Sequence, residues 1–213
     1  MGRAQRAGAP PATVGRLERM GEMVTPPTFE PVLAGRVAMA LAEDSPFLCR
    51  HLNTDPDAFA WAIHRDNWPG PRLRERIADH LRHYLEGVVD EAAWMAAARR
   101  FRARELLRIA SRDLLGVASI EESTAELTWL AEVALEAACE FARRTLDESY
   151  GTMVPAATGG GFAVLGLGKL GAGELNFSSD IDLIYLYASD GETSGGRLGI
   201  VSRHEWAVRA ARL

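Results

Sequence analysis

The stretch GLGKLGAGELNFSSDIDLIYLY, residues 166–187, carries most of the information about the fold. Apolar runs at Phe162–Leu167 and Ile181–Tyr187 predict two strands joined by a glycine-rich turn. Asp180 and Asp182 open the second run, and residues i and i+2 of a strand share a face, so the two carboxylates are expected side by side. Adjacent acids repel each other unless a cation offsets their charge. Mg²⁺ suits this role because it binds a few carboxylates together with nucleotide phosphates.

The glycines allow two interpretations. Gly168 stands eleven residues before Asp180, and a glycine turn lets backbone amides approach phosphates, which together indicate phosphoryl or nucleotidyl transfer. The alternative is a dinucleotide-binding fingerprint, Gly166-x-Gly168-x-x-Gly171. That alternative needs a long helix after the third glycine and an acid that ends the second strand. Here the acids open the strand instead, which favours the first interpretation.

Three motifs carry a resemblance. The spacing Gly168-x11-Asp180-x-Asp182 resembles the signature of the DNA-polymerase-β-like nucleotidyltransferase superfamily. The fuller string of residues 166–184 is similar to one family within it, the bifunctional glutamine synthetase adenylyltransferase/adenylyl-removing enzymes. FRARELLRIASRDLLG, residues 101–116, and SPFL, residues 45–48, resemble the same family. The similarity covers roughly residues 40–213.

The resemblance implies an α+β fold class, with a helical N-terminal array leading into a truncated polymerase-β-like mixed sheet. The family's enzymes carry two nucleotidyltransferase domains in tandem, and the wording ELNFSSDID near the start is typical of the adenylyl-removing one. In the family that domain takes AMP off a tyrosine of glutamine synthetase by phosphorolysis and releases ADP. The other domain attaches AMP from ATP, and P-II signal protein and glutamine set the balance. Glutamine synthetase, P-II signal protein, ATP, ADP and phosphate are therefore the expected partners.

By the same resemblance, Asp180 and Asp182 are the catalytic pair that holds Mg²⁺. Four further residues are assigned to nucleotide binding: Gly168, Lys169, Ser178 and Ser179. For the two serines, and for Asn176, shaping the loop is an equal alternative to contacting phosphate. Lys169 is equally well explained as an exposed turn residue.

The superfamily takes a third carboxylate from a later strand, in an arginine-rich stretch that this sequence lacks. Asp190 and Glu192 directly follow the second strand and Glu205 opens a helix, so none of them is a convincing substitute. We therefore expect weak metal binding and little or no turnover from these residues alone. Two alternatives stay open: a helical protein-interaction module with an inert nucleotidyltransferase remnant, and a nucleotidyltransferase that acts on another acceptor.

The remaining sequence divides into three segments: a flexible proline-rich leader at 1–31, a helical lead-in at 32–150, and the start of the nucleotidyltransferase domain at 151–213, opening with a glycine-rich linker. Within the lead-in, a helix is expected at 71–89. The last helix is expected to be cut within the element, because no helix-stop signal follows it.

Helix starts are predicted from four local patterns. Ser45-Pro46 and Asp55-Pro56 each place a capping side chain before a proline at the first helical position. Ser123-x-x-Glu126 and Ser202-x-x-Glu205 match the capping box, in which the glutamate reaches back to the serine amide.

Side chains outside these motifs are assigned to ordinary structure. Arginines at four-residue steps predict a solvated helix flank, partly paired with Glu105 and Asp113, with a phosphate-facing track as the alternative: Arg100, Arg104, Arg108 and Arg112. His80 and His83 lack a third ligand nearby, which argues against zinc. The five tryptophans are expected to anchor the core or helix contacts.

Composition excludes several classes of protein. The 213 residues have a net charge of −5, so sequence-independent nucleic-acid binding is not expected. Cys49 and Cys139 lie in apolar helical segments and predict buried thiols in a reducing cytoplasm. No run of about 18 uncharged apolar residues predicts a membrane span.

Overall fold

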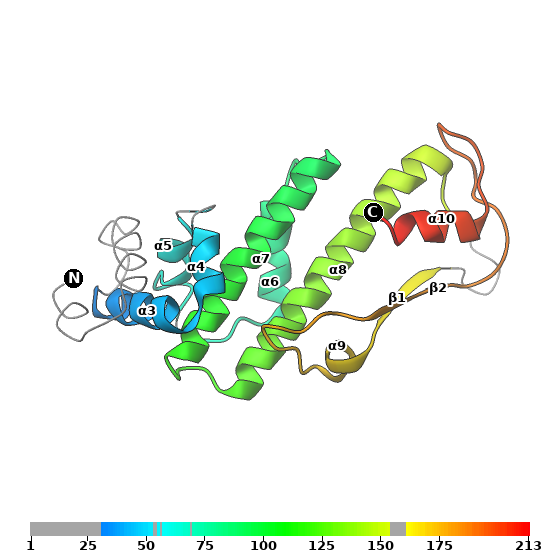
Figure 1. The fold of residues 1–213 in the computed structure, drawn as a ribbon. Coiled ribbons are helices and arrows are strands. Elements are labelled where there is room, and N and C mark those ends of the chain that lie inside the picture. The colour runs from blue at the N-terminus through cyan, green and yellow to red at the C-terminus, as the bar shows by residue number, and fades with distance from the viewer. Residues whose placement is uncertain (1–30, 53–54, 56, 69, 154–160) are drawn as a thin grey trace. The chain divides into compact units, whose positions relative to one another are not determined.

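The computed structural model describes residues 31–213 except 53–54, 56, 69 and 154–160 (Figure 1). The chain forms two compact units, Met1–Leu130 and Ala131–Leu213, and the boundary between them falls inside one long helix. The leader prediction lies outside the described residues except for Pro31, which begins the first described helix.

The first unit is helical, as predicted. Its elements are α3 (Pro31–Asp44), α4 (Pro46–Leu52), α5 (Ala58–Ala62), α6 (Arg74–Tyr84), α7 (Glu91–Leu114) and the first turns of α8 (Ile120–Tyr150). Helix α7 contacts α3, α4, α5 and α6, and is therefore the centre of this unit. The core consists of buried side chains from all of these helices, among them Val37, Leu41, Leu52, Phe59, Ile77, Phe101, Leu107 and Ile109.

Two of the predicted helix starts in this unit differ in outcome. Pro46 is the first residue of α4, and the Leu48 amide donates to Ser45 Oγ at 3.4 Å, so this cap is confirmed. The Asp55 cap is wrong, because α5 begins only at Ala58 and the Asp55 carboxylate accepts hydrogen bonds from Arg104 instead, one of them 2.7 Å long. Pairing with a cation outweighs the weaker capping interaction.

The predicted capping box at Ser123 is also wrong. Helix α8 begins at Ile120, and Ser123 lies inside it with its hydroxyl donating to Asp113 at 2.8 Å. The actual box lies four residues earlier, where the Ser119 amide donates to the Glu122 carboxylate and the Glu122 amide donates to Ser119 Oγ, both at 3.2 Å. This earlier start leaves Glu126 free for a different role.

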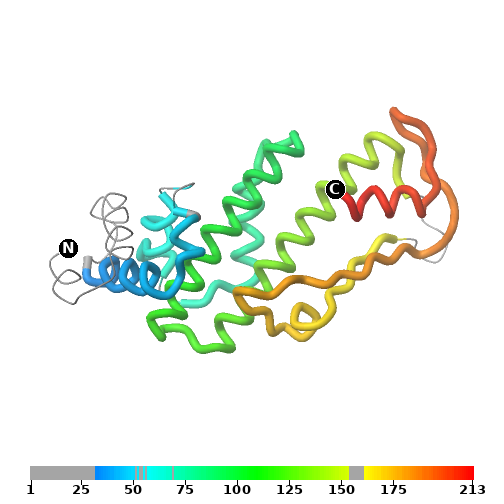
Figure 2. The backbone as a smooth tube through the Cα atoms, in the orientation of Figure 1, coloured from blue at the N-terminus to red at the C-terminus, as the bar shows by residue number. Residues whose placement is uncertain are grey.

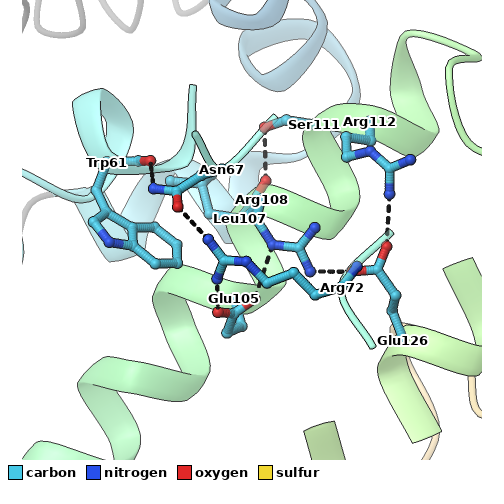
Figure 3. A network of polar contacts seen from close by, with 9 residues as sticks. All are labelled: Trp61, Asn67, Arg72, Glu105, Leu107, Arg108, Ser111, Arg112 and Glu126. Carbon is cyan, nitrogen blue, oxygen red and sulfur yellow. Dashed lines mark hydrogen bonds and ion pairs between the residues drawn. The ribbon is translucent and has the colours of Figure 1, made fainter. Parts of the chain in front are cut away.

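Glu126 belongs to a buried network of charges, drawn in Figure 3. Its carboxylate accepts from Arg108, from Arg112 Nη1 at 2.6 Å and from the backbone amide of Arg72 at 3.2 Å. Glu105 accepts from Arg108 Nε at 2.8 Å and from the Arg72 guanidinium. The network therefore joins α7, α8 and the loop before α6.

The prediction of a solvated arginine flank is wrong for half of its members. Arg108 is 0% exposed and Arg112 is 3% exposed, whereas Arg100 is exposed and Arg104 is half-buried against Asp55. Their burial is possible because carboxylates meet them: Glu105 lies on the same helix, whereas Glu126 lies on α8 and is invisible to a pattern within α7.

Burial and neighbouring charges shift the pKa values of these arginines. Burial lowers the pKa of Arg72 to about 10, although the carboxylate of Glu105 opposes that change. Burial also acts to lower the pKa of Arg108, but the charges of Glu105 and Glu126 outweigh it and raise the pKa overall. The Arg72 guanidinium additionally lies 4.9 Å from the ring centroid of Trp61 and donates to Asn67. These contacts hold the loop before α6 against the centre of the unit.

The second unit combines helices with a strand pair. It contains the later turns of α8 together with β1 (Phe162–Gly166), α9 (Gly168–Ala172), β2 (Leu183–Tyr187) and α10 (Arg203–Ala210). The strands pair antiparallel, with Phe162 opposite Tyr187 and Gly166 opposite Leu183. Figure 2 shows the chain leaving β1, turning through α9 and returning along β1 as β2.

This hairpin confirms both predicted strands and the α+β class, with two adjustments. The second strand begins at Leu183 rather than Ile181, and the described residues form one antiparallel pair rather than a mixed sheet. The antiparallel order also contradicts the dinucleotide-binding alternative, which needs parallel strands joined by a long helix. Between β1 and β2 there is only the five-residue helix α9.

Helix α10 begins at Arg203, with Ser202 as its N-cap, as predicted. The Ser202 hydroxyl accepts from the Glu205 amide at 3.1 Å, whereas the Glu205 carboxylate binds Arg209 rather than reaching back. Trp206 is 2% exposed and meets the Phe162 ring edge-on at 5.8 Å, which confirms a core role for this tryptophan. Trp94 is buried as well.

The structure also describes both cysteines and the helices that could be compared with a membrane span. Neither Cys49 nor Cys139 forms a disulfide, and each is half-buried rather than fully buried. Among the residues that the structure describes, no helix is long and apolar enough to cross a membrane.

Candidate functional site

The turn after β1 contains backbone conformations and close backbone contacts that favour glycine. Gly168 opens α9 with φ at +54°, in the left-handed region. A β-carbon at Gly171 would lie 2.5 Å from the carbonyl oxygen of Gly166, so a side chain there would push the turn away from the strand. Leu170, 6% exposed, anchors the turn on its inner side.

Helix α9 ends in a glycine cap. Gly173 has φ at +77°, its amide donates to the Leu170 carbonyl at 3.2 Å, and the Glu174 amide donates to the Lys169 carbonyl at 2.8 Å. This pair of bonds is the Schellman motif, which stops a helix and redirects the chain. The Lys169 carbonyl is thereby occupied, while its side chain is exposed.

The two aspartates lie just before β2 and both are exposed. The Leu167 amide donates to the Asp182 carbonyl at 2.9 Å, which continues the hairpin pairing past Gly166. This bond holds the backbone of Asp182 beside the start of the glycine turn. Gly168, Lys169 and both aspartates therefore lie in the segment that joins β1 to β2, at one end of the hairpin.

Ser178 and Ser179, which directly precede Asp180, form hydrogen bonds with the side chain of Asn176. Asn176 Oδ1 accepts from Ser179 Oγ at 2.7 Å, from Ser178 Oγ at 3.2 Å and from the Ser178 amide at 3.2 Å. Both hydroxyls thus point to the Asn176 side chain and shape the loop. Asn176 is the residue whose role the sequence underrates, although an Asn two residues before a Ser is a recognised turn signal.

The two aspartates could supply part of the coordination shell of a Mg²⁺ ion, but not all of it. Asp180 and Asp182 supply hard oxygen ligands, and within the described residues no ion pair neutralises either carboxylate. Mg²⁺ is commonly held by only one or two carboxylates, with waters and substrate phosphates completing its octahedron. No group of three or more His, Cys, Asp or Glu side chains suited to a metal occurs in the part of the chain that the structure describes. These two acids therefore fit an ion that is shared with a phosphate-bearing substrate.

A hollow of about 540 Å³ lies elsewhere in the second unit. Its walls include Cys139 and Asp147 of α8, Phe162 of β1 and Trp206 of α10. Burial raises the pKa of Asp147, with Arg143 opposing, and burial also raises the pKa of the Cys139 thiol. Because Phe162 stands at the opposite end of β1 from Gly166, this hollow is separate from the acid pair.

Comparison with known proteins identifies related sequences. Residues 35–213 match the family model described as glutamate-ammonia ligase adenylyltransferase. The bifunctional glutamine synthetase adenylyltransferase/adenylyl-removing enzyme of Nitrosomonas europaea is 35% identical over 189 residues, 85% of this chain and 20% of that protein. The proteins of the same name from Pseudomonas aeruginosa and Nitrosococcus oceani are 36% and 42% identical, over 74% and 62% of this chain and 16% and 14% of their own lengths. The chain therefore spans about a fifth, or less, of the curated relatives it matches.

Proposed function

The chain belongs to the glutamate-ammonia ligase adenylyltransferase family, and from this premise we propose that it supplies a nucleotidyltransferase site acting on glutamine synthetase. Within that activity we propose the adenylyl-removing reaction. Phosphate would attack the phosphorus of the AMP group held on a tyrosine of glutamine synthetase. The bond from phosphorus to the tyrosine oxygen breaks, the tyrosine oxygen takes up a proton, and ADP leaves.

The observation that carries the proposal is the position of the acid pair beside the glycine turn. The 2.9 Å bond from the Leu167 amide to the Asp182 carbonyl holds the backbone of Asp182 beside the turn that opens α9, and Asp180 lies two residues earlier in the chain. Gly168 leaves space at the turn, because nothing lies within 4 Å of the position that a β-carbon would take. A substrate phosphate can therefore approach the turn and the acids together.

Each residue has a proposed task. Asp180 and Asp182 would hold Mg²⁺, which when bound would offset the negative charge of the transferred adenylyl group. The exposed Lys169 ammonium would attract the incoming phosphate. Because the described residues contain no group of three or more His, Cys, Asp or Glu side chains suited to a metal, we propose that these 213 residues bind the metal weakly and turn over slowly on their own. P-II signal protein and ATP are proposed as partners of the whole enzyme.

A chimeric enzyme tests this function. Residues 35–213 would replace the aligned stretch of the Pseudomonas aeruginosa relative, and ADP release from adenylylated glutamine synthetase would be followed with Mg²⁺ and phosphate. We expect Asp180→Asn and Asp182→Asn each to lower the rate at least about 100-fold, since each removes a charge on which metal binding depends. Asp190→Asn, an exposed acid just past β2, is the matched control and should keep the rate within about twofold.

The other activity of the chimera separates the remaining outcomes. Attachment of AMP from ATP should persist in both Asp variants, which shows that the chimera is folded. If attachment is lost and removal persists, the direction proposed here is wrong. If neither reaction responds to the acids while the chimera is folded, the site is wrong, and the helical interaction module becomes the better account.

A further inference from the structure

We propose that Asn176 is a positioning residue for the acid pair, acting through its side-chain oxygen. This inference rests on the proposed function, because it concerns how Asp180 and Asp182 are presented to the metal. It assigns Ser178 and Ser179 to the same device and not to phosphate binding. The ligand involved is a divalent cation.

The side-chain oxygen of Asn176 accepts three hydrogen bonds from Ser178 and Ser179 in the loop before Asp180. Its Oδ1 accepts from the Ser178 amide at 3.2 Å, from Ser178 Oγ at 3.2 Å and from Ser179 Oγ at 2.7 Å. The backbone closes around it, since the Ser179 amide donates to the Asn176 carbonyl at 3.2 Å and the Asn176 amide donates to Ser179 Oγ at 3.3 Å. Five hydrogen bonds thus fix a four-residue turn.

This turn is one of two anchors on either side of Asp180. On the N-terminal side, Ser179 is bonded to Asn176 through both its hydroxyl and its amide. On the C-terminal side, the Asp182 carbonyl is bonded to the Leu167 amide at 2.9 Å. Only Asp180 and Ile181 lie between the anchors. Loss of the first anchor would free the backbone of Asp180 while leaving Asp182 in place.

The orientation of the Asn176 amide follows from its partners. Two hydroxyls and one backbone N–H converge on the same atom, and a backbone N–H can only donate, so that atom is the oxygen. The NH₂ group is therefore directed away from the three donors. A role through the oxygen and a role through the NH₂ group predict opposite results for an aspartate at this position, because aspartate keeps the acceptor and loses the donor.

Direct metal binding tests the inference on the 213-residue chain. Mn²⁺, a paramagnetic substitute for Mg²⁺, would be titrated with the free ion measured by electron paramagnetic resonance. Groups that orient metal ligands typically contribute about 10–100-fold to affinity, so Asn176→Leu should weaken Mn²⁺ binding about tenfold or more. Asn176→Asp should bind within about threefold of the unmodified chain, or more tightly. Ser179→Ala should weaken binding more than Ser178→Ala, because Ser179 makes the shorter bond and holds both ends of the turn.

A purely structural role would not give this pattern. Asn176 is exposed, so we expect the urea midpoint of every variant to stay near that of the unmodified chain. If Asn176→Leu leaves Mn²⁺ affinity unchanged while Asp180→Asn and Asp182→Asn abolish binding, the positioning role is wrong and the acid pair stands. If Asn176→Asp weakens binding as much as Asn176→Leu does, the NH₂ group is the one that matters. If the chain binds no Mn²⁺, or binds it without the two aspartates, both the inference and the proposed metal site fail.

Discussion

Replacing Glu126 with glutamine is the sharpest test of how the first unit is stabilised. The Glu126 side chain is 0% exposed, and its carboxylate accepts hydrogen bonds from the side chains of Arg108 and Arg112 and from the Arg72 backbone amide. Glutamine keeps one acceptor oxygen and removes the charge. Among the described residues, the one carboxylate still paired with Arg108 would be Glu105, and the one still near Arg112 would be Glu122, at 3.6 Å and with a side chain 40% exposed.

The expected cost follows from the loss of one charge inside this network. Removing one partner of a buried ion pair typically costs about 3–5 kcal/mol, since the other charge stays buried without compensation. Because glutamine keeps an acceptor and Arg108 keeps a second carboxylate, we place Glu126→Gln near the lower end, at about 3 kcal/mol. For a unit of roughly 100 residues, this corresponds to a fall in Tm of roughly 12–24 °C.

Urea unfolding followed by circular dichroism at 222 nm would measure this cost. Glu121→Gln is the matched control, since Glu121 lies on the same helix, is exposed, and its carboxylate interacts with the Ser119 hydroxyl and its own backbone amide at the helix start rather than with a buried charge. That control should leave the urea midpoint near that of the unmodified chain. An equally small loss for Glu126→Gln would refute the claim that the buried charges hold the helices together.

Three further perturbations have definite outcomes. Burial, followed by the charge of Arg72, lowers the pKa of His80 from its usual value near 6.5. The unfolded chain therefore binds more protons than the folded chain, so the free energy of unfolding should fall as the pH drops below about 6.5. His80→Gln should make urea midpoints depend less steeply on pH in that range. Ser119→Ala removes the observed capping box and should cost about 1 kcal/mol in urea unfolding, and an unchanged midpoint would contradict the box. Gly171→Ala places a β-carbon 2.5 Å from the strand's last carbonyl and should weaken Mn²⁺ binding, whereas Gly161→Ala, with open space around it, should not.

Local signals predict the hairpin well. Two apolar runs separated by glycines need no distant partner to be recognised, and β1 and β2 form where these runs lie. The caps at Ser45 and Ser202 are equally local, and both are observed. The capping box at Ser123 shows the limit of such patterns. Ser119-x-x-Glu122 matches the same pattern four residues earlier, and only the tertiary structure decides between the two.

The sequence predicts the position of the two aspartates, but it does not decide the role of the serines in the loop before them. The spacing of Asp180 and Asp182 from Gly168 is visible in one line of sequence, and the structure places these residues at one end of the hairpin. The serines are ambiguous because a hydroxyl suits both a phosphate and a turn. Three hydrogen bonds to one atom of Asn176 favour the turn, and such convergence depends on dihedral angles that no spacing rule contains.

The stretch at residues 101–116 resembles the family for a different physical reason than residues 166–182 do. In the first stretch, Glu105, Arg108 and Arg112 are buried and satisfy one another or Glu126, so their identities are explained by the fold of the unit. In the second stretch, the two aspartates are exposed and take part in no ion pair within the described residues, and the role proposed for them is metal binding. Substitutions in the first stretch should therefore change the free energy of unfolding, and substitutions at the acids should change metal affinity with little effect on unfolding. A variant of Asp180 that unfolds as easily as Glu126→Gln would show that this division of roles is wrong.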